Sequence, residues 1–112
     1  MKKNNILRKP RKKVGRMKII IDKYFLMQLK EKLGYGKDMR VELLTDYSLS
    51  KPDIFGIKIY LKNFPFDKHY KTIETTTDEI KKIMQLPKNY ILRKSYKNDE
   101  IIEYFEEDVE YE

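Results

Sequence analysis

The segment 54–63, IFGIKIYLKN, carries the clearest alternation of apolar and polar residues in this chain. One set of alternate positions is apolar (Phe55, Ile57, Ile59, Leu61), and the other is cationic or aromatic (Lys58, Tyr60, Lys62). Successive side chains of a β-strand point to opposite faces of the sheet. The segment therefore predicts a strand with one buried and one exposed face, and the rest of the fold must supply a cover for the buried face.

The remaining periodicities predict two helices and further strands. Apolar residues recur at helical spacing in 23–33 and 78–86, and short β-branched or alternating runs occupy 17–21, 39–44, 89–96 and 101–107. Asp22 and Thr76, the latter followed by Glu79, have the spacing of helix N-caps, and Gly34 and Pro87 mark helix ends. The order indicates an α+β fold: a ferredoxin-like βαββαβ antiparallel sheet with two helices on one face and an extra C-terminal strand.

Charge divides the chain into three parts. Residues 1–18 hold nine Lys or Arg and no acid, whereas residues 99–112 hold eight acids and no base. A block of one sign is typical of an interaction tail. We expect a disordered basic tail over 1–16, one α+β domain over 17–108, and an acidic C-terminal end over 109–112. Met17 directly follows the basic tail and is an alternative start of the chain.

Several function classes find no signal in the sequence. The chain has no Cys and one His, His69, which argues against a disulfide framework and against a metal site. No phosphate-binding or metalloprotease motif occurs, so we expect no cofactor and no enzymatic activity. No apolar run reaches the length of a membrane span or of a signal peptide. The expected location is the cytoplasm of a cell or of an infected host cell.

The open sheet face and the basic tail together favour a nucleic-acid-binding role. Lysine and arginine neutralise phosphates, and aromatic rings stack on bases. The expected partner is RNA or DNA, or a nucleoprotein complex. The predicted contact residues are Lys9, Arg11, Lys12, Lys13, Arg16, Lys18, Arg40, Lys58, Tyr60 and Lys62.

The acidic C-terminal strand supports a different hypothesis. A phage or mobile-element inhibitor can imitate a phosphate backbone with spaced carboxylates and so bind a host nuclease or polymerase. The residues for that role are Glu103, Tyr104, Glu106, Glu107 and Asp108. An exposed sheet face or this last strand can also support a homodimer.

Three aromatic residues lie in the segment 63–76, which shows no clear period. Phe64, Phe66 and Tyr70 are expected to fold back as a lid over the edge of the core, with a contact surface for a partner as the alternative.

Overall fold

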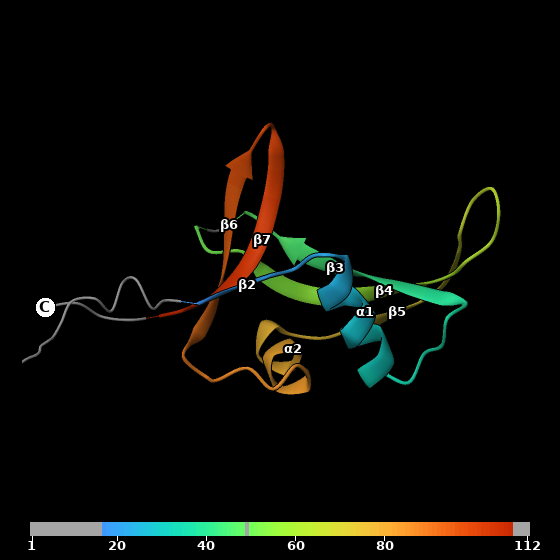
Figure 1. Ribbon diagram of the computed structural model, residues 1–112, viewed down its shortest axis with the longest axis horizontal. Helices are drawn as coiled ribbons and strands as arrows, with labels where there is room; N and C mark the ends of the chain where they lie inside the picture. The colour runs from blue at the N-terminus through green and yellow to red at the C-terminus, as the bar shows by residue number, and fades with distance from the viewer. Residues whose placement is uncertain (1–16, 49, 109–112) are drawn as a thin grey trace, which may run out of the picture.

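Two three-stranded antiparallel sheets and two helices form the part of the chain that the computed structural model describes, residues 17–48 and 50–108 (Figure 1). The first sheet has the order β3–β4–β5 and consists of β3 (Met39–Asp46), β4 (Asp53–Leu61) and β5 (Lys68–Glu74). The second has the order β2–β7–β6 and consists of β2 (Lys18–Ile20), β7 (Glu100–Glu107) and β6 (Tyr90–Lys97). Helices α1 (Lys23–Lys32) and α2 (Thr77–Ile83) lie on the same side of the first sheet (Figure 1).

Local signals begin both helices where the sequence predicts, and α1 also ends as predicted, whereas α2 ends at Ile83, before the predicted end at Pro87. The Asp22 carboxylate accepts hydrogen bonds from the backbone N–H groups of Tyr24 and Phe25, both at 3.0 Å, and so caps α1. Gly34 follows α1 with a φ of 91°, a conformation that favours glycine. At α2, the Thr76 hydroxyl accepts a hydrogen bond from the backbone N–H of Glu79 at 3.1 Å. These contacts satisfy backbone groups that have no partner within the helix.

Strands β6 and β7 form a hairpin near the C-terminus. Lys97 of β6 pairs with Glu100 of β7, which leaves Asn98 and Asp99 as a two-residue turn. Both turn residues have positive φ, 52° and 64°, as a type I′ turn requires. Figure 1 shows this hairpin extending away from the helices.

The α+β class with two helices on one sheet face is confirmed, but the strand order is not ferredoxin-like. That order requires β2 to lie beside β4, whereas β2 pairs with β7 through Ile19 and Phe105. Both edges of β4 are already occupied, because β3 pairs with one and β5 with the other. The segment that forms β5 shows no clear period in the sequence. Its pairing with β4 occupies the edge that a ferredoxin-like order gives to β2, and β2 lies beside β7 instead.

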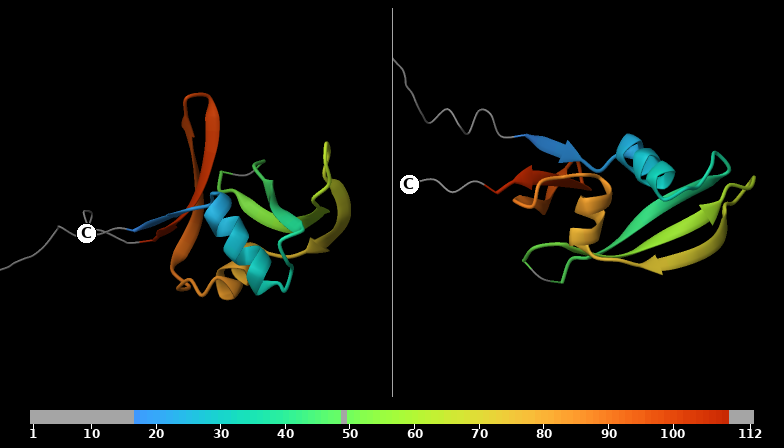
Figure 2. Two further views of the ribbon diagram at one scale, coloured as in Figure 1. Left: turned by 45° about the vertical axis from the view of Figure 1, so that its right-hand side comes forward. Right: turned by 90° about the horizontal axis from the view of Figure 1, so that it is seen from below.

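One core joins the two sheets, which appear as distinct units in both views of Figure 2. Phe105 of β7 is fully buried and packs its ring against Phe25 of α1, with the ring centroids 6.0 Å apart. Leu29 of α1, Ile80 of α2 and Ile59 of β4 are also fully buried in this core. The second sheet is therefore anchored to the first through the helices and the Phe105 side chain.

Within residues 17–48 and 50–108, neither helix is long enough or apolar enough to cross a bilayer.

Candidate functional site: the outer sheet face and a groove beside β3

The alternation in β3 and β4 brings three predicted contact residues together. Arg40 lies opposite Tyr60 in the strand register, and Glu42 lies opposite Lys58. These side chains project from the face of the first sheet that turns away from the helices, because the intervening Val41 and Ile59 are buried in the core. We call this surface the outer face. The prediction that Arg40, Lys58 and Tyr60 share one face is confirmed.

Much of the charge on the outer face is neutralised by its own carboxylates. Arg40 donates to Glu42 at 2.6 Å, and it also donates through Nε to Asp67. The guanidinium carbon lies 4.2 Å from the centre of the Tyr60 ring, and the His69 ring packs against Tyr60 edge-on at 5.9 Å. A base can stack on the Arg40 side of Tyr60 only after the guanidinium moves. The outer face is therefore less available to a polyanion than the sequence indicates.

The contact between Arg40 and Asp67 has a measurable pH signature. The Arg40 hydrogen bond, assisted by the backbone N–H of Asn63, holds the pKa of Asp67 below its ordinary value. We expect Arg40→Met to raise the pKa of Asp67, and NMR titration of the side-chain carboxyl measures the change. Asp46 is the internal control, because the low pKa of Asp46 comes from the backbone N–H of Ser48.

The same contact should make stability depend on pH. Because the pKa of Asp67 is lowered in the folded state, the stabilisation is present above the unfolded value of about 4 and is lost as the pH falls through the folded value. The difference in unfolding free energy between wild type and Arg40→Met should therefore shrink on acidification below about pH 4. An unchanged Asp67 titration in the variant would contradict this assignment.

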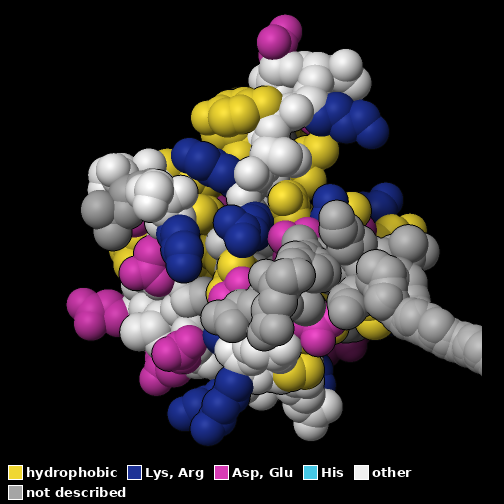
Figure 3. Space-filling view, turned by 90° about the vertical axis from the view of Figure 1, so that its left-hand side faces the viewer, with side chains coloured by type: hydrophobic (Ala, Val, Ile, Leu, Met, Phe, Trp, Pro, Cys, Tyr) yellow, Lys and Arg dark blue, Asp and Glu magenta, His cyan; other side chains and the backbone are white. Residues whose placement is uncertain are grey.

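The structure separates Lys18 from the other predicted contact residues. Lys18 belongs to the second sheet, where it lies opposite Glu106, and its ammonium sits 5.0 Å from the centre of the Tyr104 ring. Figure 3 views the end of the molecule near β2 and shows cationic and anionic side chains interspersed there. The other five predicted residues, Lys9, Arg11, Lys12, Lys13 and Arg16, lie outside the described residues.

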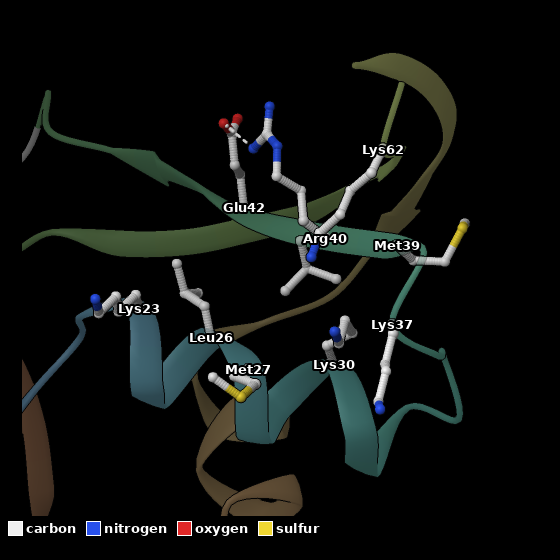
Figure 4. Close-up of a pocket in the computed structure, with 10 residues that line it drawn as sticks. Lys23, Leu26, Met27, Lys30, Lys37, Met39, Arg40, Glu42 and Lys62 are labelled. Carbon is white, nitrogen blue, oxygen red and sulfur yellow. Dashed lines mark hydrogen bonds and ion pairs between the residues drawn. The ribbon is translucent and has the colours of Figure 1, made fainter. Parts of the chain in front are cut away.

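A groove of about 610 Å³ lies between α1 and β3 (Figure 4). Helix α1 contributes Lys23, Leu26, Met27 and Lys30 to its lining. Strand β3 and the residues before it contribute Lys37, Met39, Arg40, Val41 and Glu42, and Lys62 follows β4. We call it the α1–β3 groove. It contains five cations and one acid, and that acid is already paired with Arg40. It brings the predicted Arg40 and Lys62 together with three lysines that the sequence analysis did not single out.

A helical stripe could have revealed part of this groove. Positions 23, 26, 27 and 30 follow the i, i+3, i+4, i+7 spacing, and they form a second stripe beside the core stripe that contains Phe25 and Leu29. The stripe is apolar in its middle and cationic at both ends. Lys37 and Lys62 reach the same groove only through tertiary structure, and no sequence signal links them to α1.

The carboxylates of the acidic strand are largely engaged within the fold. Glu106 is only 6% exposed and lies 3.3 Å from Nε of Arg93. Tyr47 donates a hydrogen bond to Glu103, and burial together with that carboxylate raises the pKa of Tyr47. Strand β7 is also the central strand of its sheet, flanked by β2 and β6. The carboxylates of Glu103 and Glu106 are thus held by neighbouring side chains, which leaves the phosphate-mimic hypothesis with less support.

The aromatic residues between β4 and β5 do not form a lid. Phe64 is 94% exposed and Phe66 is 81% exposed, so neither ring covers the core. Tyr70 packs edge-on against Tyr35 with ring centroids 6.5 Å apart.

Neither a metal site nor a known relative guides the assignment further. Across residues 17–48 and 50–108, no three His, Cys, Asp or Glu side chains are placed to share a metal ion. His69 lies 2.9 Å from the hydroxyl of Thr72. Comparison with known protein families, with curated proteins and with solved structures finds no match.

Proposed function

We propose that the protein binds nucleic acid without catalysing a reaction on it, and that residues 1–16, here called the basic segment, supply most of the affinity. The distribution of charge carries this proposal. Eight of the 25 cations lie in the basic segment, which contains no acid, and two of the 18 acids lie in 109–112. The described residues therefore hold 17 cations and 16 acids and are close to neutral.

The folded domain adds contacts rather than the main attraction. On the outer face, Lys58 is partly exposed and Glu42 lies opposite it, while Arg40 is paired with two carboxylates. Phosphate contacts from a cationic segment do not read sequence. The proposal is thus for binding with little sequence preference, with RNA and DNA both as candidate partners.

The salt dependence of binding tests this proposal. Fluorescence anisotropy with a labelled single-stranded oligonucleotide should give a linear fall of log K against log salt, with a slope steeper than about −3, because about eight cations neutralise phosphates. Oligonucleotides of different base composition should bind with similar affinity. Absence of binding at 50 mM salt, or binding that does not respond to salt, would refute the proposal.

A further inference from the structure

Strand β3 has one edge that no described strand covers. Its partner is β4, and the pairing between them is antiparallel. The backbone N–H of Lys62 donates to the carbonyl of Asp38 at 2.8 Å, and these two residues continue the register in which Arg40 faces Tyr60. In an antiparallel pair, hydrogen-bonded and non-hydrogen-bonded residues alternate. The residues of β3 that bond β4 are therefore Arg40, Glu42 and Leu44.

The alternate residues direct their backbone groups away from β4. Val41 and Leu43 each present a backbone N–H and C=O at the uncovered edge. The alternation also includes Met39, whose N–H points away from β4 and donates to the carbonyl of Gly36 at 3.2 Å. No hydrogen bond from another described backbone group reaches Val41 or Leu43 at this edge. Such an edge is a template for an added strand.

The α1–β3 groove runs beside this edge and has an apolar floor. Leu26, Met27, Met39 and Val41 line it, and the Met27 side chain is well exposed. An added strand directs alternate side chains to one face, so every second residue of an incoming segment would lie against this floor. An apolar floor suits aliphatic side chains better than a sugar–phosphate backbone.

The charges around the floor select the other residues of the incoming segment. Lys30 is only 8% exposed as a whole, but its ammonium reaches solvent, and no carboxylate of the described residues forms an ion pair with it. Lys23, Lys37 and Lys62 also lack a carboxylate partner in the described part of the chain. An anionic ligand in the groove would gain charge-assisted hydrogen bonds from these lysines, whose apolar stems line the groove.

We propose that the α1–β3 groove binds an extended acidic segment of another protein, which adds as a strand to β3. Its backbone pairs with Val41 and Leu43, its aliphatic side chains contact Leu26 and Met27, and a carboxylate pairs with Lys30. The observations favour a polypeptide over nucleic acid because only a polypeptide uses both the strand edge and the apolar floor. This inference does not rest on the proposed nucleic-acid binding, which depends on the basic segment.

The first test uses a labelled octapeptide that alternates glutamate with valine, titrated into the full-length protein by fluorescence anisotropy. We expect the peptide to bind and an octapeptide that alternates lysine with valine not to bind. Lys30→Met should weaken binding about tenfold, since it removes one charge-assisted hydrogen bond while keeping the apolar stem. Lys32→Met is the matched control, because Lys32 is exposed on the same helix outside the groove, and it should change the affinity less than about twofold.

A second test reports on the strand edge without any substitution in the protein. Amide hydrogen exchange measured by NMR should slow at Val41 and Leu43 when the acidic peptide is added, and N-methylation of the pairing edge of the peptide should abolish both binding and protection. Absence of peptide binding, or binding that leaves these two amides unprotected, would overturn the proposal.

Competition distinguishes other occupants of the groove. An oligonucleotide that displaces the peptide and loses affinity in Lys30→Met would assign the groove to nucleic acid and overturn the proposal. Protection of Val41 and Leu43 that grows with protein concentration in the absence of peptide would assign it to a second copy of this chain, which would also overturn it. Loss of oligonucleotide binding with intact peptide binding would remove only the nucleic-acid function.

Discussion

Replacement of Lys9, Arg11, Lys12 and Lys13 by glutamine in the full-length chain should flatten the salt dependence of oligonucleotide binding by about 3 in the log–log slope. Each phosphate that loses its cation no longer releases a counterion on binding, and for single strands each contact contributes about 0.7 to the slope. These four cations are half of those in the basic segment. Anisotropy titrations at several salt concentrations measure the slope directly.

A variant of the folded domain with the same change in net charge is the control. Lys51, Lys68, Lys71 and Lys88 are exposed residues of the folded domain, outside both the outer-face contacts and the α1–β3 groove. Their replacement by glutamine should change the log–log slope by less than about 1. These lysines lie outside the basic segment, and the described residues as a whole carry almost no net charge. If the two variants lower the slope equally, net charge rather than the basic segment determines binding, and the proposed function loses its basis.

Phe105→Ala should cause the largest loss of stability that this structure predicts, about 3–5 kcal/mol in the free energy of unfolding. The Phe105 side chain is fully buried, contacts Phe25 of α1 and links the second sheet to the core beneath the first. Its removal costs the burial free energy of the ring and leaves a cavity in the core that joins the two sheets. Urea unfolding followed by circular dichroism measures the change through the midpoint.

Phe55→Ala is the matched control for Phe105→Ala. Both residues are phenylalanines in strands, but Phe55 is 53% exposed. Its truncation should cost less than about 1 kcal/mol, as is usual for an exposed side chain away from the core. Equal losses in the two variants would show that the packing between the sheets is not what the structure describes.

The two proposals together describe a protein with two separate binding surfaces. In the first proposal the basic segment attracts nucleic acid by charge alone, and in the second the α1–β3 groove combines a strand edge, an apolar floor and a set of lysines without carboxylate partners among the described residues. The chemistry of the first accepts any polyanion, and that of the second requires an acidic polypeptide with alternating aliphatic residues. A protein of this kind would bring an acidic protein segment close to nucleic acid.

Sequence periodicity was most reliable where each residue's environment is set locally. The alternation in 54–63 predicts β4 and the outward positions of Lys58 and Tyr60, since a strand sends neighbouring residues to opposite sides. Phe55 was expected on the buried face but is 53% exposed, and Ile54 is buried instead, beside the register shift between Leu44 and Thr45. The caps at Asp22, Gly34 and Thr76 were predicted because a few adjacent residues satisfy helix ends. The hairpin turn at Asn98 and Asp99 is local in the same sense.

Strand β5 shows where periodicity carried no information. Of its seven residues only Ile73 is partly buried, and the register shifts at Tyr70, so no alternation marks it as a strand. It is a strand because its backbone pairs with β4, and an edge strand of this kind needs little apolar surface. That pairing occupies the edge of β4 that a ferredoxin-like order gives to β2, and β2 belongs to the second sheet instead.

The sequence by itself determined the α+β class, the two helices with their caps, and the concentration of positive charge in residues 1–16. Tertiary structure alone decided which strands are neighbours, that Arg40 is neutralised by Asp67, and that Lys30 lies with Lys37 and Lys62 around one groove. The reason is physical: caps, turns and periodicity depend on residues a few positions apart. Sheet order and grooves depend on contacts between distant segments, and the sequence carries no local signal for which of these contacts form.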